Sequence, residues 1–154
     1  MLRKVTREDF QKLFTWVNDE EVRKNSRYTE EKNLEEYKDW FFKALKDKNL
    51  FMFIQVVDEK DVGQVKLEIS QQEITFNYSI AKEHRGNGFG TATIRDAQRF
   101  INENKDLFTA NSKLVAYIRE GNIPSCRVFE KLGYIKVFQC EDYVKFQKKC
   151  SVSC

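Results

Sequence analysis

Three residue types on which many active sites and linkers depend are scarce in this sequence. Its 154 residues include one histidine, His84, one proline, Pro124, and six glycines. A single histidine excludes a histidine-rich metal site, and any Ser-His-Asp arrangement would have to use His84. Internal repeats and Gly/Pro/Ser-rich linkers are also missing. We therefore expect one domain over residues 1–147, followed by a short polar tail over residues 148–154.

Long hydrophobic runs are missing as well. The longest apolar block, Leu50–Val57, is interrupted by Gln55. It is far shorter than the roughly 20 apolar residues that a membrane-spanning helix needs. The first residues, Met1–Val5, contain no apolar stretch of signal-peptide length. We therefore expect a cytoplasmic protein that is not associated with a membrane.

The cysteines lack the spacing of a metal site. Structural zinc sites usually show close pairs such as C-x-x-C, and cytosolic thiols stay reduced. The four cysteines are Cys126, Cys140, Cys150 and Cys154. No metal is expected, and the default interpretation of Cys126 is a small buried side chain.

A large charge excess of one sign is also absent. The chain has 27 Lys+Arg and 24 Asp+Glu, a net charge of +3. Nucleic-acid binders usually carry a larger, clustered excess, and mixed runs such as Glu30–Lys32 are typical of solvated surface. We expect no nucleic-acid partner. What the chain does contain is 41% hydrophobic residues, enough for a packed core in a domain of this size.

Hydrophobic periodicity predicts a mixed α/β fold. Helical spacing favours helices over residues 7–17, 33–46, from 90 onward and 123–132. Alternating or continuous apolar segments favour strands over residues 2–5, 50–57, 62–69, 74–80, 114–118 and 135–146, the last being one strand or two. The order is β-αα-βββ-α-β-α-β. Three consecutive strands favour an antiparallel meander, and the later strand-helix-strand order favours a parallel crossover, unlike a doubly wound Rossmann sheet.

The segment Ile80–Thr91 is the most informative part of the sequence. A predicted strand ends, three glycines fall within five residues, and a helix begins. Glycine allows positive φ, and a helix N-terminus offers unpaired N–H groups to a phosphate or pyrophosphate. Arg85 could add a charge-assisted contact. The pattern G-x-G-x-G at residues 86–90 fits neither a P-loop nor the Rossmann fingerprint. A glycine-rich turn without a ligand is the alternative.

Two motifs together resemble the GNAT family of acetyl-CoA-dependent N-acyltransferases. Arg85, Gly88 and Gly90 match R/Q-x-x-G-x-G/A, and residues 122–134 resemble N-x-x-[SA]-x-x-x-[FLY]-E-K-x-G-[FY]. The element order also matches, so the resemblance covers nearly the whole chain. It is nearest to the branch of ribosomal-protein N-terminal and amino-sugar acetyltransferases. It implies the GNAT fold, with a central mixed, mostly antiparallel sheet flanked by helices.

The resemblance implies acetyl-CoA as the cofactor and assigns its contacts by position. Backbone groups of Tyr78, Ser79 and Ile80 would bind the pantetheine arm, and a bulge there would splay the two central strands. Asn122 would cap its helix and face the pantetheine, with capping alone as the alternative. The pyrophosphate would be held by backbone N–H groups of the glycine loop: Arg85, Gly86, Asn87, Gly88, Phe89, Gly90 and Thr91.

The implied reaction is attack of a neutral amine on the acetyl thioester. One branch of the family uses a Glu five residues before the Asn and a Tyr seven residues after it, but here those positions hold Tyr117 and Phe129. Ser125 is then the candidate donor to the leaving sulfur, unless its hydroxyl bonds its own helix. Tyr117 and Glu68 are candidate bases, with packing, surface exposure or a water chain as alternatives.

His84, although the only imidazole, is assigned a structural role beside the cofactor.

The acceptor should bind against the first two helices. Residues 16–23 resemble the W-x-N-x-x-x-V-R segment of GNAT enzymes that acetylate amino sugars on nucleotide carriers. Trp16 and Trp40 could stack on a sugar or base, or simply border the core. Asn18 and Arg23 could bind hydroxyl or phosphate groups. A small-molecule amine is therefore expected, with an amino-sugar nucleotide as the first guess.

Several alternatives stay open on the sequence. Within the enzyme class, the acceptor could be a protein N-terminus, a polyamine or an antibiotic. From another class, a catalytically silent acyl-CoA-binding module would fit the missing Tyr acid. Exposed sheet edges would allow a homodimer, but no residue pattern specifies one.

Overall fold

The centre of the sheet is an antiparallel meander, as the three consecutive strand patterns predict. The computed structural model describes residues 1–109, 112–140 and 142–150. In it β2 (Leu50–Val57), β3 (Lys60–Ser70) and β4 (Glu73–Ile80) pair in sequence order. A two-residue turn joins β3 to β4, with Ser70 opposite Glu73. The alternating apolar pattern of these segments therefore predicts both the strands and the hairpin between them.

The remaining strands extend the meander on both sides. β1 (Leu2–Lys4) pairs with β2, while β5 (Lys113–Arg119), β7 (Tyr143–Lys149) and β6 (Ile135–Cys140) continue beyond β4. The seven strands have the order β1-β2-β3-β4-β5-β7-β6. Among the strands of the described residues, only β4 and β5 pair in parallel, and α4 (Phe89–Glu103) joins them, which confirms the predicted crossover. The segment predicted as one strand or two forms two, and β7 reaches into the residues assigned to a tail.

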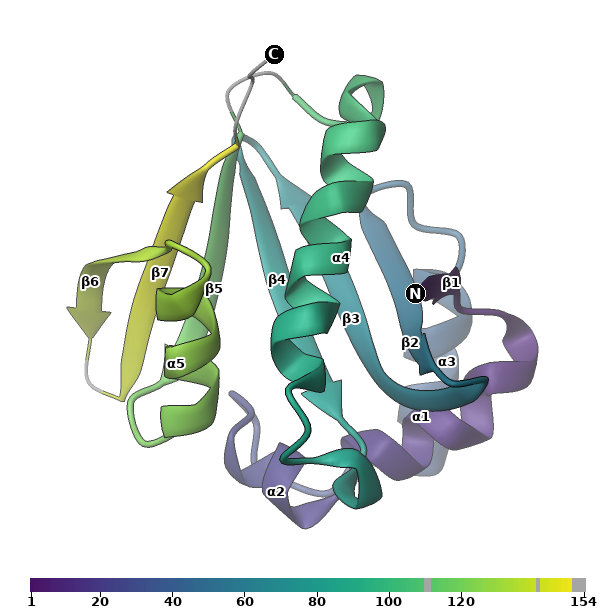
Figure 1. Cartoon of the computed structure of the whole chain (residues 1–154). Helices are drawn as coiled ribbons and strands as arrows, with labels where there is room; N and C mark the ends of the chain where they lie inside the picture. Colours follow the sequence, from purple (N-terminus) through teal and green to yellow (C-terminus); the bar gives the residue numbers. More distant parts are fainter. Residues whose placement is uncertain (110–111, 141, 151–154) are drawn as a thin grey trace.

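Helices cover both faces of the sheet (Figure 1). α4 and α5 (Ile123–Lys131) lie on one face. The other face carries α1 (Phe10–Val17) and α3 (Leu34–Ala44), while α2 (Glu20–Lys24) lies at the lower edge of the sheet in Figure 1. Short 3-10 turns occur at Arg7–Asp9, Lys82–His84 and Lys105–Leu107. The predicted mixed α/β fold is confirmed, although α2 was not predicted. In the described residues, no helix is long and apolar enough to cross a membrane.

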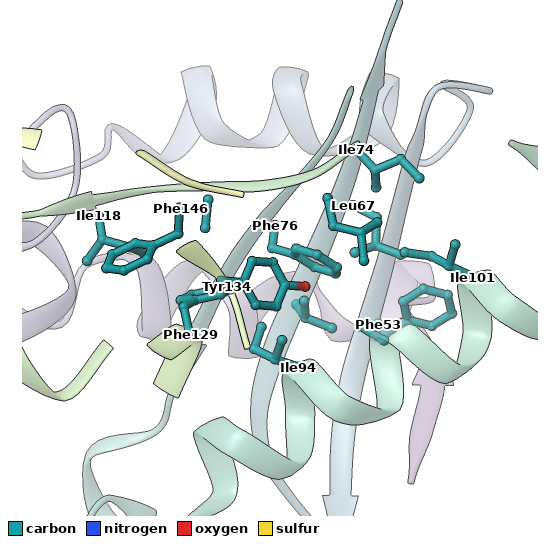
Figure 2. Close-up of a cluster of buried hydrophobic side chains, with 14 of the residues drawn as sticks. Phe53, Leu67, Ile74, Phe76, Ile94, Ile101, Ile118, Phe129, Tyr134 and Phe146 are labelled. Atoms are coloured by element: carbon teal, nitrogen blue, oxygen red, sulfur yellow. The ribbon is translucent and has the colours of Figure 1, made fainter. Parts of the chain in front are cut away.

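Two cores hold these layers together. The larger core lies between the sheet and the helices α4 and α5. Figure 2 shows its cluster of aromatic and branched side chains, among them Phe53, Ile94 and Phe129. The smaller one packs Leu13 of α1 and Phe41 of α3 against Ile54 of β2. Each fully buried side chain of this size stabilises the fold by roughly 1.5–3 kcal/mol relative to exposure. The sheet is thus held firmly from both faces.

β4 and β5 separate toward their carboxyl ends. They pair at only three positions, from Glu73 opposite Lys113 to Thr75 opposite Val115. Past these positions neither strand has a ladder partner on the facing edge in the described part of the chain. The predicted splay is therefore present. We call this opening, bordered by residues 76–80 of β4 and 116–119 of β5, the splay.

The predicted bulge at Tyr78–Ile80 is wrong. The register between β3 and β4 runs without a shift from Gly63 opposite Ile80 to Ser70 opposite Glu73. Gly63 explains how β4 stays so close to β3, because a Cβ atom there would lie 2.5 Å from the carbonyl oxygen of Ser79. β4 follows β3 to its end while it diverges from β5, and the register shift nearby lies between β2 and β3, at Gln55/Val56 beside Gly63.

Candidate active site

The glycine loop leaves its helix N-terminus open to a ligand. Gly86 and Gly88 have φ values of 81° and 78°, a left-handed conformation that favours glycine. Gly88 is the N-cap of α4 and has no side chain that could cap the helix. The backbone N–H groups of the first turn therefore stay available to a ligand. A Cβ atom on either glycine would meet no atom within 4 Å. This open, electropositive cradle fits a pyrophosphate.

The side chains of the loop are used to hold its shape. Asn87 donates from Nδ2 to the carbonyl oxygen of His84 at 3.1 Å. The His84 ring lies 6.5 Å from the Phe89 ring, between centroids, consistent with the structural role expected of it. Arg85 donates from Nε to the carbonyl oxygen of Ile80 at 3.0 Å and from Nη2 to Asp19 Oδ1 at 2.7 Å. The Arg85 guanidinium is thus turned toward α2, and the pyrophosphate contacts predicted for this loop are left to backbone N–H groups.

α2 spans the mouth of the splay. Its N-cap, Asp19, is bonded to Arg85 beside the end of β4, while Arg119 at the end of β5 donates from Nε to the carbonyl oxygen of Ser26 at 2.9 Å. Figure 1 shows α2 below the carboxyl ends of both strands. We call residues 19–26 the strap. Partial burial raises the pKa of Asp19, but hydrogen bonds from Arg85 and the Val22 N–H outweigh it and lower the pKa overall.

Two hydroxyl groups meet on the α5 side of the splay. Asn122 caps α5, its Oδ1 accepting from the Ser125 N–H at 3.4 Å. The Ser125 Oγ lies 2.8 Å from the Tyr78 Oη. The Tyr78 ring passes beneath the first turn of α4, where a Cβ atom on Gly90 would lie 3.2 Å from its Cε2. The Ser125 hydroxyl is therefore paired with a side chain from β4, and the sequence prediction missed this role of Tyr78.

Phe129 belongs wholly to the core. Its side chain is 0% exposed, and its ring lies 5.0 Å from the Tyr134 ring and 6.1 Å from the rings of Tyr78 and Phe146, between centroids. The sequence assigns Tyr78 a role through its backbone only, because its side chain alternates with Phe76 on the same face of the predicted strand. The sequence signal that could have separated it is its place beside the glycine loop.

The two candidate bases lie on the opposite face of the sheet from Ser125. Their strand neighbours, Ala116 and Leu67, belong to the core beneath α4 and α5, so Tyr117 and Glu68 point the other way. Tyr117 is 48% exposed. Glu68 lies opposite Thr75, where β4 and β5 are still paired. Glu68 is therefore at the closed end, and the three catalytic candidates do not form one cluster.

Tyr117 has partners that the sequence prediction did not name. Its hydroxyl donates to Glu73 Oε1 at 3.5 Å, and the Lys145 Nζ donates to Glu73 Oε2 at 2.7 Å. The hydrogen bond to Glu73 raises the pKa of Lys145, so this lysine stays charged beside the Tyr117 ring. A carboxylate and a cation thus flank the phenol. In the described chain no group of three or more His, Cys, Asp or Glu side chains could hold a metal ion.

The predicted acceptor residues mostly make contacts within the protein. Asn18 accepts from the Lys32 N–H at 2.6 Å and donates to the Lys32 carbonyl oxygen at 3.3 Å. Arg23 donates to the Asn18 carbonyl oxygen at 3.2 Å. Trp16 packs against the smaller core. The Asn18 and Arg23 side chains therefore order the segment around the strap, and Trp16 belongs to the smaller core.

Trp40 is more open but is not a free stacking surface. It is 39% exposed, and the Lys66 Nζ lies 4.9 Å from the centre of its ring. Burial lowers the pKa of Lys66, while the charge of Glu68 opposes that change. A sugar or base could stack on this face of Trp40 only by displacing the lysine.

Residues 1–135 match the family model described as an acetyltransferase (GNAT) domain. The chain belongs to the GNAT family. This GNAT domain is an acyltransferase whose acetyl donor is acetyl-CoA, and the open glycine cradle and the splay fit that donor. Among proteins with curated annotation, none matches the sequence.

Solved structures share the fold over nearly their whole length. A domain from Methanocaldococcus jannaschii DSM 2661 superposes with a TM-score of 0.82 and 20% identity, covering 97% of both chains. Spermidine N-acetyltransferase from Vibrio cholerae, in complex with CoA and spermine, has a TM-score of 0.80 and 19% identity, covering 97% of this chain and 94% of that one. An aminoglycoside acetyltransferase in complex with coenzyme A has a TM-score of 0.80 and 14% identity, with coverage of 97% and 94%.

These similarities support the GNAT fold without supporting the narrower branch expected from the sequence. The two enzymes named above are a spermidine and an aminoglycoside acetyltransferase, and neither of these acceptors is an amino-sugar nucleotide or a ribosomal protein. At 14–20% identity the likeness concerns the fold alone. The acceptor must therefore be argued from the residues of this chain.

Proposed function

We propose that the protein transfers the acetyl group of acetyl-CoA to a primary amine of a small, polycationic acceptor. The observation that carries acetyl transfer is the open glycine cradle at the start of α4 beside the splay. A helix N-terminus and a strand edge together can bind a pyrophosphate and an extended arm. Backbone N–H groups of residues 85–91 would hold the pyrophosphate, and residues 78–80 with Asn122 would line the arm.

Charge supports the polycationic acceptor. Residues 18–40, on the side of the sheet where the acceptor is expected, carry eight acidic and five basic side chains, although the whole chain is net positive. An acidic surface raises the local concentration of cationic amines and speeds their association. The neighbouring spermidine and aminoglycoside acetyltransferases act on such amines. The amino-sugar nucleotide becomes the second candidate because Asn18 and Arg23 are occupied within the protein.

The reaction asks little covalent chemistry of the protein. Bound acetyl-CoA supplies an acetyl thioester, which a neutral amine attacks, with the CoA thiol as the second product. A backbone N–H near Ile80 would stabilise the developing oxyanion, and Ser125 would donate to the leaving sulfur. Much of the acceleration would come from holding the amine and thioester together in the splay.

Tyr117 is the better placed of the two candidate bases. Its backbone lies on the free half of β5, past the last pair with β4, although its hydroxyl reaches back to the Glu73 carboxylate at the paired end. We expect Tyr117→Phe to lower kcat by about 100-fold, because general-base catalysis contributes at least that much. Glu68→Gln should stay within about 3-fold of wild type, since Glu68 lies at the closed end of the splay. Steady-state kinetics give kcat for both variants. A large loss of kcat in Glu68→Gln with little loss in Tyr117→Phe would make Glu68 the base.

The acceptor class is tested by competition among amines. We expect kcat/KM for spermidine or kanamycin to exceed that for an amino-sugar nucleotide by at least about 10-fold, and to fall with added salt as surface charge is screened. Thiol release measured over a range of salt concentrations gives both quantities. A higher kcat/KM for the amino-sugar nucleotide would refute the polycationic acceptor and restore the first guess.

The proposal includes a cytoplasmic location and a homodimer. Cys126 and Cys150 are free thiols, which supports a reducing compartment such as the cytoplasm. Cys154 lies outside the described residues. β6 is an edge strand with Ile135 64% and Val137 43% exposed, which supports a homodimer through this edge. One spermidine N-acetyltransferase structure from Vibrio cholerae is dodecameric.

A further inference from the structure

The hydrogen bond between Tyr78 and Ser125 joins β4 to α5 beside the splay. Tyr78 lies on β4, Ser125 lies in the first turn of α5, and their hydroxyl oxygens are 2.8 Å apart. Either oxygen can donate to the other. A serine in this position would normally bond its own helix backbone. Here the Tyr78 hydroxyl can donate to the Ser125 oxygen, which leaves the Ser125 proton free to point into the splay.

The phenol is held firmly in this position. The Tyr78 ring lies 6.1 Å from the buried Phe129 ring and passes close to Gly90, which has no side chain to obstruct it. Gly90 therefore provides the space that lets a tyrosine from β4 reach α5. The position seven residues after Asn122 holds Phe129, which has no hydroxyl and is fully buried. Instead, Tyr78 brings a hydroxyl from β4 to the first turn of α5, beside Ser125.

We propose that Tyr78 acts through Ser125 to stabilise the leaving sulfur by hydrogen bonding. This inference rests on the proposed function. As the carbon–sulfur bond breaks, Ser125 donates a hydrogen bond to the developing thiolate, and Tyr78 donates one to the Ser125 oxygen. CoA leaves as the thiolate, and the proton that the attacking amine loses passes by way of the base to solvent, from which the thiolate is protonated. Atoms and charge balance without any further reagent.

Burial keeps the Tyr78 phenol protonated, so that it can donate to Ser125 throughout the reaction. Burial raises the pKa of Tyr78, and the hydrogen bond with Ser125 partly opposes that rise. The phenol is therefore neutral at physiological pH and can donate. A donor next to the sulfur favours the thiolate over the thiol, because hydrogen bonding to a charged form stabilises it. The pair should therefore lower the pKa of the CoA thiol even in the binary complex, before any acceptor binds.

The binary complex with CoA gives a direct test. We expect the thiol of bound CoA, followed by thiolate absorbance in the ultraviolet, to titrate about one pH unit below that of free CoA. Tyr78→Phe and Ser125→Ala should each remove most of that difference while CoA affinity stays within about 3-fold. Each should lower kcat by about 100-fold. The double variant should be no slower than Ser125→Ala, because residues acting as one unit are not additive.

Tyr134→Phe is the matched control. It removes a hydroxyl from the same aromatic cluster, but that hydroxyl donates to Gln98 Oε1 at 2.8 Å, on α4. We expect wild-type thiol titration and kcat in this variant. Thermal melts of all variants separate loss of the hydroxyl from loss of the fold.

Each outcome decides. Wild-type thiol titration and kcat in folded Tyr78→Phe would overturn the inference. Should Tyr78→Phe not fold, wild-type values in Ser125→Ala would overturn it equally. A thiol pKa that depends on Tyr78 in a protein that acetylates no amine would refute the proposed function and leave the contact with sulfur standing. Absence of CoA binding to the wild-type protein would overturn both.

Discussion

Gly88→Val should weaken CoA binding by at least about 100-fold, equivalent to about 2.7 kcal/mol, in a protein that still folds. Gly88 has a φ of 78°, and the space around its missing side chain is empty. A branched side chain would occupy the cradle above the N–H groups at the start of α4, so the pyrophosphate could no longer approach them. Left-handed backbone in a residue other than glycine adds roughly 1–2 kcal/mol of strain.

Gly133→Val separates the strain from the steric block. Gly133 lies just after α5 and has a φ of 89°. A Cβ atom there would lie no closer than 3.7 Å to the Lys148 side chain. The backbone cost is of the same kind, but Gly133 is remote from the glycine loop. Titration calorimetry should give wild-type CoA affinity for Gly133→Val. Equal CoA affinity in the two variants, both folded, would remove the glycine loop from the binding site.

Phe129→Ala should lower the free energy of unfolding by about 3–5 kcal/mol. The side chain is completely buried, and it packs among the rings of Phe76, Tyr78, Tyr134 and Phe146. Removal of the ring loses the transfer free energy and leaves a cavity that a rigid aromatic cluster fills poorly. Urea unfolding followed by circular dichroism measures the change.

Phe129→Leu provides the graded comparison. It keeps much of the volume, so we expect it to lose clearly less stability than the alanine variant. A loss below about 1 kcal/mol in Phe129→Ala would contradict the assignment of this side chain to the core.

The sequence is most informative where a local pattern has a local cause. Alternation along β3 and β4 comes from one face packing on α4, so it predicts strands and hairpin together. Asn122 precedes a helix and caps it, as its residue type favours. The loop at Gly86–Gly90 combines positive φ with a helix N-terminus, and both properties follow from glycine spacing.

Features that depend on distant partners were not predictable in the same way. The strap contains a helix of only five residues, and it is held by Arg85 and Arg119 from far along the chain. The sequence around Asn18 resembles a sugar-binding segment, yet the oxygen and the nitrogen of its side-chain amide both bond the backbone of Lys32. The partnership of Tyr78 and Ser125 crosses 47 residues of sequence and depends on Gly90 for space. No periodicity reports such contacts.

The splay shows the same limit. A bulge was expected to create it, because an inserted residue is the local device that bends a strand. The structure instead keeps β4 in register with β3 and uses Gly63 to permit a close approach. The opening was predicted correctly, but the bulge expected to create it is not found between β3 and β4.

The most direct test of acetyl transfer is the stoichiometry of products. The purified protein is incubated with acetyl-CoA and spermidine, and both the free CoA thiol and the acetylated amine are quantified over time. We predict one equivalent of acetylated amine for each equivalent of thiol, with turnover removed in Gly88→Val and retained in Gly133→Val. CoA binding without any acetylated amine, across polyamines, aminoglycosides and amino-sugar nucleotides, would contradict the account and favour a catalytically silent module.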